Sequence, residues 1–153
     1  SDDLFMGFGL FFSLWVVVVA KFSDIGALLV GKAIGRTKLA PSISPGKTIE
    51  GLIGGFGASA GMGALLPWIF QEKFSDVVYF GDWVFTPAQG ALWGLVIALS
   101  AVIGDLIASV MKRLASMKDS GGAIPGIGGL FDLTDSLILA APTGYLILFL
   151  LQK

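Results

Sequence analysis

The run LFMGFGLFFSLWVVVVA, from Leu4 to Ala20, contains no charged residue. About 20 apolar residues are enough for a helix to cross a bilayer. Three more apolar runs follow at residues 51–70, 91–111 and 130–151, the last of them interrupted by two aspartates. These runs are long and continuous, unlike the alternating segments of membrane β-strands, so each of them predicts a membrane-spanning helix.

The composition agrees with a membrane protein. Of the 153 residues, 55% are hydrophobic and only 14% are charged, against about 25% charged residues in a typical soluble domain. We therefore expect an all-α, polytopic integral membrane bundle of four to five transmembrane segments, with residues 1–153 forming a single domain. The number of segments depends on residues 21–35, which either extend the first span or form a separate short helix; the sequence leaves both alternatives open.

Charge is distributed unevenly between the apolar runs. The loop after residue 31 and the loop after residue 111 are both basic, whereas the loop QEKFSDVVYFGDW carries Glu72, Asp76 and Asp82 against a single Lys73. Two spans separate the basic loops, which therefore lie on the same side of the membrane. The positive-inside rule puts that side in the cytoplasm. We expect a multi-pass protein of the cell (inner) membrane in which any active site built from the basic loops faces the cytoplasm.

The second apolar run is rich in small residues, GLIGGFGASAGMG. Small residues let membrane helices approach one another closely. We expect these glycines to serve helix packing, and the same glycine-rich faces are compatible with a homodimer.

Asp105 lies within the third apolar run. Ser109 and Lys112 follow it by four and seven positions, so on a helix the three form a polar stripe that Arg113 flanks. Ionisable residues at such depth are costly to insert and usually face a cavity or a partner. Basic side chains that reach the lipid headgroups are an equally good explanation for Lys112 and Arg113. A stabilising pair with Lys112 is a weaker explanation for Asp105, because seven positions are too far for a tight pair unless the helix bends.

Asp132 and Asp135 are three residues apart at the start of the last run, where they can share one face of a helix. Helix capping explains one aspartate more easily than two. With Asp105 they make three carboxylates in a chain that has no histidine and no cysteine, a ligand set that suits a hard cation such as Mg²⁺. The preceding SGGAIPGIGG segment has the backbone freedom to approach phosphate oxygens, although glycine-rich loops are also ordinary connectors.

These residues also form a recognisable motif. The pattern S-x-x-K-R-x(4)-K-D-x-G begins at Ser109, and P-G-x-G-G and D-x-x-D-S follow from Pro125 and Asp132. The arrangement resembles the signature of the phosphatidate cytidylyltransferases, also called CDP-diacylglycerol synthases. The block from Lys21 to Gly51, with its core Ser-Pro-x-Lys-Thr-x-Glu-Gly, is similar to the same family. The resemblance spans most of the chain and implies the C-terminal portion of a longer protein with additional N-terminal helices.

The resemblance implies transfer of CMP from CTP to phosphatidic acid in the lipid bilayer, a step of phospholipid biosynthesis that yields CDP-diacylglycerol and pyrophosphate. The implied cofactor is Mg²⁺, with one cation or two, and no nucleic-acid partner is expected. The metal ligands would be Asp105, Asp132 and Asp135. The catalytic residues would be Ser109, Lys112, Arg113, Lys118 and Asp119. The nucleotide-site residues would be Lys47, Glu50, Gly121, Gly126, Gly128 and Gly129, with a membrane-surface contact as the alternative for Lys47.

Two positions depart from the family pattern. The family commonly has His where this chain has Ile127, and Arg where it has Leu133, so no role of those side chains operates here. Two other functions stay open at this point. A CTP-dependent lipid kinase would pass the terminal phosphate to an isoprenoid alcohol. The second alternative is that the chain is part of an ion-coupled transporter. It would explain why Asp24 and Asp105 lie within apolar runs, but it leaves the basic cluster and the aspartate pair unexplained.

Overall fold

The computed structural model describes residues 2–74, 78–80, 83–118 and 137–151. Its helices are α1 (Asp2–Ile34), α2 (Ile49–Lys73), α4 (Pro87–Lys118) and α6 (Leu137–Leu151). Two short antiparallel hairpins lie between helices. The hairpin of β1 (Lys38–Ala40) and β2 (Ser44–Thr48) connects α1 to α2, and the hairpin of β3 (Tyr79–Phe80) and β4 (Trp83–Val84) lies between α2 and α4.

The predicted all-α membrane bundle is confirmed. Within the described part of the chain, three helices are long and apolar enough to cross a bilayer, over residues Met6–Ile34, Ile49–Lys73 and Pro87–Leu114. The fourth predicted span is seen as the shorter apolar helix α6, and its expected start at residue 130 lies outside the described residues. The hairpins were not predicted, because their strands of two to five residues carry no apolar run of their own.

Residues 21–35 extend the first span rather than forming a separate helix. Helix α1 continues to Ile34 and has 33 residues, which at a rise of about 1.5 Å per residue is about 50 Å. A bilayer core is about 30 Å thick, so part of α1 tilts within the membrane or extends beyond it. Two charged residues of this segment, Lys21 and Asp24, pair with each other on the helix surface, with the Lys21 Nζ and Asp24 Oδ2 atoms 3.8 Å apart.

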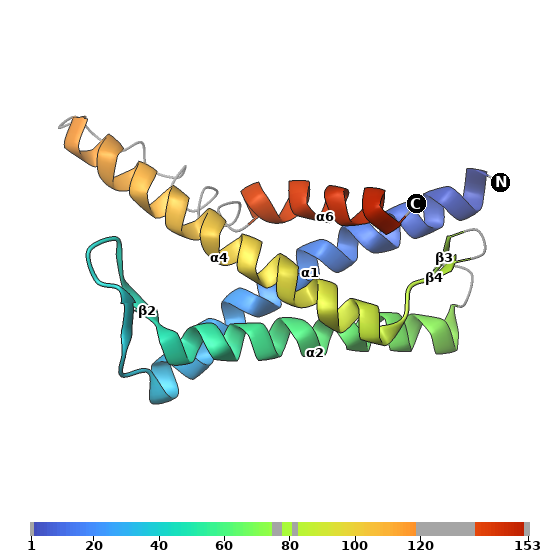
Figure 1. Cartoon of the computed structure of the whole chain (residues 1–153), viewed down its shortest axis with the longest axis horizontal. Helices are drawn as coiled ribbons and strands as arrows, with labels where there is room; N and C mark the ends of the chain where they lie inside the picture. Colours follow the sequence, from blue (N-terminus) through green and yellow to red (C-terminus); the bar gives the residue numbers. More distant parts are fainter. Residues whose placement is uncertain (1, 75–77, 81–82, 119–136, 152–153) are drawn as a thin grey trace.

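Successive helices run in opposite directions, so the two hairpins lie at opposite ends of the bundle (Figure 1). The β1–β2 hairpin, the end of α1, the start of α2 and the end of α4 lie at one end, which we call the basic end. The β3–β4 hairpin, the end of α2 and the start of α4 lie at the other. The prediction that both basic loops occupy the same side is confirmed, because the Arg113 Nε atom of α4 donates to the Ile43 carbonyl of the β1–β2 hairpin.

Glycines bring the helices together, as the sequence predicted for the second span. A Cβ atom on Gly26 of α1 would lie 2.8 Å from the carbonyl oxygen of Gly54 on α2, and one on Gly63 of α2 would collide with the carbonyl of Gly90 on α4. Backbone contact of this kind is possible only without side chains. These crossings fix the register of α1, α2 and α4, and thereby the side chains that meet at the basic end.

Aromatic packing fills the opposite half of the bundle. Phe11, Phe12 and Trp15 of α1 surround Phe85, with ring centroids 5.1–6.4 Å from it, and all four side chains are buried. The indole Nε1 of Trp15 donates to the Gly63 carbonyl at 3.0 Å, so its polar atom is satisfied. Aromatic side chains therefore make up much of the core in this half.

Candidate active site

A cavity of about 640 Å³ opens among α1, the β1–β2 hairpin, α2 and α4 at the basic end. Its charged lining residues are Asp24 of α1, Lys47 of β2 and Asp105 of α4, and Ser23 and Thr48 add hydroxyl groups. The rest of the lining is glycine, alanine, valine and leucine. A pocket that combines apolar walls with a few convergent polar groups is the usual form of a small-molecule site.

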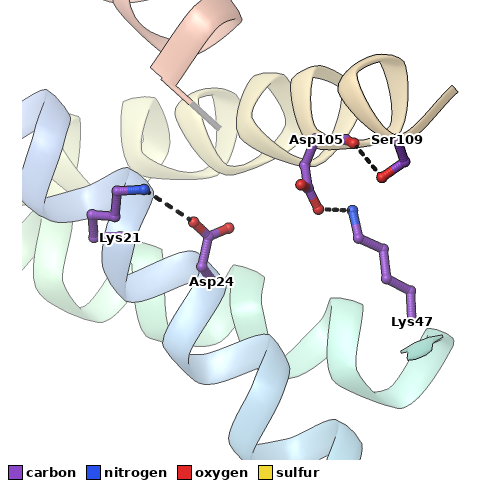
Figure 2. Close-up of polar contacts among 5 residues, drawn as sticks. All are labelled: Lys21, Asp24, Lys47, Asp105 and Ser109. Atoms are coloured by element: carbon purple, nitrogen blue, oxygen red, sulfur yellow. Dashed lines mark hydrogen bonds and ion pairs between the residues drawn. The ribbon is translucent and has the colours of Figure 1, made fainter. Parts of the chain in front are cut away.

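Asp105 and Lys47 form an ion pair across this cavity (Figure 2). Their side chains are 34% and 24% exposed respectively, so the pair is partly screened from water. The two residues come from different elements, and the glycine-mediated contact of α2 with α4 sets their register. The sequence assigned Asp105 to a metal and Lys47 to the nucleotide; the structure brings the two into direct contact.

Ser109 lies about one turn after Asp105 on α4, and its hydroxyl points back along the helix. The Ser109 Oγ donates to the backbone carbonyl of Asp105 at 2.8 Å (Figure 2). Back-bonding of this kind is common for serine in helices. Ser109 therefore satisfies a helix carbonyl in this structure, and its predicted phosphate contact stays a prediction.

The α1 side of the cavity holds a buried polar atom. The Ser23 side chain is 1% exposed, and its Oγ has no hydrogen-bond partner among the described residues. A buried polar atom lowers the free energy of unfolding unless it has a hydrogen-bond partner. Next to it, Asp24 lines the cavity and pairs with Lys21. Both residues belong to the block from Lys21 to Gly51 that resembles the family. For Asp24 the sequence allowed either a place in the cavity or a pair with Lys21 or Lys32, and the structure shows the cavity position together with the Lys21 pair.

Glu50 holds the base of the β1–β2 hairpin. Its carboxylate accepts hydrogen bonds from the backbone N–H groups of Arg36 and Thr37 at 3.2 Å and from the Thr37 hydroxyl at 2.9 Å. The adjacent Thr48 caps α2 by accepting the Gly51 N–H at 3.1 Å, as N-cap threonines do. Glu50 therefore ties the end of α1 to the start of α2 and is absent from the cavity lining.

The tip of the hairpin is held by α4. The Arg113 Nε donates to the Ile43 carbonyl at 2.6 Å, and within the hairpin the Lys38 Nζ donates to the Pro45 carbonyl at 2.8 Å. The sequence assigned Arg113 to phosphate, and no pattern signals a contact with a loop 70 positions away. With Glu50 at the base and Arg113 at the tip, the hairpin is fixed over the cavity from two sides.

The other predicted site residues are described only in part. Lys112 lies beside Arg113 on α4, and Lys118 is the last residue of that helix. The remaining ones lie outside the described residues: Asp119, Gly121, Gly126, Gly128, Gly129, Asp132 and Asp135. Within residues 2–74, 78–80, 83–118 and 137–151, no three histidine, cysteine or acidic residues gather as a metal site. The described part of the cavity supplies two carboxylates, Asp24 and Asp105.

Replacing Glu50 with Gln should loosen the hairpin. A neutral amide oxygen accepts hydrogen bonds less strongly than a carboxylate, so the amides of Arg36 and Thr37 should exchange with deuterium roughly tenfold faster. The matched control is Glu72→Gln at the other end of α2, which should leave these amides unchanged. Unaltered exchange at Arg36 and Thr37 in the Glu50 variant would contradict the anchoring role.

Comparison with known proteins identifies the family of the chain. The sequence profile of the cytidylyltransferase family matches residues 4–151. The chain is 44% identical over 129 residues to a phosphatidate cytidylyltransferase of Synechocystis, covering 84% of this chain and 40% of that protein. It is 40% identical over 134 residues to the Haemophilus influenzae enzyme of the same name, covering 88% and 44%.

A third relative, the phosphatidate cytidylyltransferase of Helicobacter pylori strain 26695, is 34% identical over 155 residues, covering 97% of this chain and 51% of the relative. The chain thus spans about half the length of the curated relatives that it matches. The profile match covers almost the whole chain. This chain belongs to the cytidylyltransferase family.

Proposed function

We propose that the protein transfers CMP from CTP to phosphatidic acid, producing CDP-diacylglycerol and pyrophosphate. The observation that carries the proposal is family membership over residues 4–151, together with relatives that are named phosphatidate cytidylyltransferases. A cavity with apolar walls and three charged residues at the basic end of an apolar bundle supports it, because this reaction joins a water-soluble nucleotide to a membrane lipid. The activity is proposed for the whole protein.

The cavity fits a hard divalent cation. Asp105 and Asp24 bring carboxylate oxygens, and Ser23 brings a buried hydroxyl that has no partner among the described residues. Mg²⁺ prefers oxygen ligands and is commonly held by one or two carboxylates together with substrate phosphates. Asp105 would hold Mg²⁺ together with Asp132 and Asp135. The cation would neutralise the charge that develops on the α-phosphate and the departing pyrophosphate.

The chain's own residues would act by positioning and charge. Lys112 and Lys118, on the last turns of α4, would bind the phosphates of the nucleotide. Arg113 would fix the β1–β2 hairpin, which carries Lys47. The attacking group would be a phosphate oxygen of the lipid, which is already ionised at neutral pH. The residues would therefore have to orient the two substrates and need not remove a proton, in keeping with a chain that has no histidine.

The membrane orientation is part of the proposal. The positive-inside rule supports a basic end that faces the cytoplasm, where CTP is available, in a multi-pass protein of the inner membrane. The homodimer that glycine-rich faces suggest stays a prediction, which cross-linking in native membranes would test.

Pyrophosphate release tests the proposed function. The full-length protein in lipid nanodiscs should release pyrophosphate only when CTP, phosphatidic acid and Mg²⁺ are all present. Release without phosphatidic acid would indicate a nucleotide hydrolase, and no release from a well-folded preparation would contradict the proposal.

A further inference from the structure

We propose that Lys47 is the counter-ion of Asp105 in the cavity and that a divalent cation must displace it to bind Asp105. The released Lys47 ammonium then binds a phosphate of the nucleotide. The inference deepens the proposed function and rests on it, because it takes Asp105 as a cation ligand. It starts from the ion pair between the Lys47 Nζ and the Asp105 Oδ2 across the cavity (Figure 2).

The ammonium of Lys47 occupies the carboxylate that the cation needs. A hard cation and an ammonium group both bind carboxylate oxygens, and two positive charges on one carboxylate repel each other. Both side chains line the same cavity and are only 24% and 34% exposed, so water screens this repulsion incompletely. Cation binding to Asp105 therefore competes with Lys47.

The fold does not need this ion pair to keep the hairpin in place. Glu50 fixes the base of the hairpin through Arg36 and Thr37, and Arg113 fixes its tip through the Ile43 carbonyl. Lys47 also has a flexible four-carbon stem. Its ammonium can therefore leave Asp105 while β2 stays where it is, and the pair is free to open.

The released ammonium would remain in the cavity, where a phosphate group is its natural partner. A nucleotide that supplies this phosphate therefore favours cation binding, and by reciprocity the cation favours nucleotide binding. Without nucleotide, Lys47 keeps the affinity of the site for the cation low. Lys47 thus couples the two ligands, a role distinct from simple phosphate binding.

The test measures Mn²⁺ binding by electron paramagnetic resonance on the full-length protein in nanodiscs, first with no nucleotide. Lys47→Met should bind Mn²⁺ about three- to tenfold more tightly than the parent, because a partly buried competing charge is gone. CTP, added without lipid acceptor, should strengthen Mn²⁺ binding in the parent and do so markedly less in Lys47→Met. Lys47→Gln provides a second neutral variant with the same expectation.

Two matched variants separate this mechanism from a general change of charge. Lys38→Met removes the same charge from the same hairpin, but the Lys38 ammonium contacts the Pro45 carbonyl instead of Asp105, so Mn²⁺ affinity should not change. In the Asp105→Asn background, the Lys47→Met substitution should no longer tighten Mn²⁺ binding.

Three results would overturn the inference: unchanged or weaker Mn²⁺ binding in both Lys47 variants, equal tightening by Lys38→Met, or tightening that persists with Asp105→Asn. Failure of the proposed function looks different. In that case CMP transfer would be absent from the parent protein, whereas the tightening of Mn²⁺ binding by Lys47→Met through Asp105 would still be observed.

Discussion

Asp105→Asn is expected to lower the rate of CMP transfer by a factor of about 100 or more, because a charged group that acts on the transition state typically contributes this much. Asn has nearly the same shape as Asp but lacks the negative charge that a cation and Lys47 both require. The rate of pyrophosphate release with saturating CTP and phosphatidic acid measures the loss. The fold should survive, because the Asp105 contact with Ser109 uses the backbone carbonyl and not the side chain.

The matched control for this loss is Glu72→Gln, which removes one acidic charge at the opposite end of the bundle. It should release pyrophosphate at the parental rate. An Asp105→Asn variant that keeps its rate within a factor of about three of the parent would mean that Asp105 neither holds the cation nor contributes to the reaction.

Gly63→Ala and Gly61→Ala should have opposite effects on stability, although they are two residues apart on α2. A Cβ atom on Gly63 would collide with the Gly90 carbonyl of α4, which cannot move unless the helices separate. Overpacking of this kind costs about 1–3 kcal/mol. A Cβ atom on Gly61 would meet nothing within 4 Å, and alanine is favoured over glycine in a helix by roughly 1 kcal/mol.

Thermal unfolding of both variants in the same detergent provides the comparison. Gly63→Ala should have a lower Tm than the parent, and Gly61→Ala an equal or higher one. Equal Tm values for the two variants would contradict the close α2–α4 crossing, and with it the register that brings Lys47 and Asp105 together.

The sequence was sufficient to predict the parts of the fold that depend on local composition. Apolar runs revealed the spans, the charge of the loops indicated which ones share a side, and small residues marked the helix contacts. The continuity of α1 was not predictable in the same way. By hydropathy, Lys21 and Asp24 interrupt the apolar run of the first span. On the helix these two residues pair with each other, and α1 continues past them.

The site was predictable only as a set of residues. Asp105 was predicted to be functional, because an ionisable residue within an apolar span is costly to insert into the membrane. The structure places it in the cavity. Its contact with Lys47 was not predictable, because it depends on how α2 and α4 cross and on a hairpin too short to leave a pattern. For the same reason the sequence could not show that Arg113 and Glu50 support the hairpin, or that Ser23 faces the cavity.

CMP transfer is distinguished from phosphate transfer by two radioactive labels of CTP, followed in parallel reactions with phosphatidic acid and Mg²⁺. We expect the α-phosphate label to enter the lipid fraction as CDP-diacylglycerol, while the γ-phosphate label leaves as pyrophosphate. A γ-phosphate label in the lipid, with the α-phosphate label left in CDP, would rule out CMP transfer and show a lipid kinase instead.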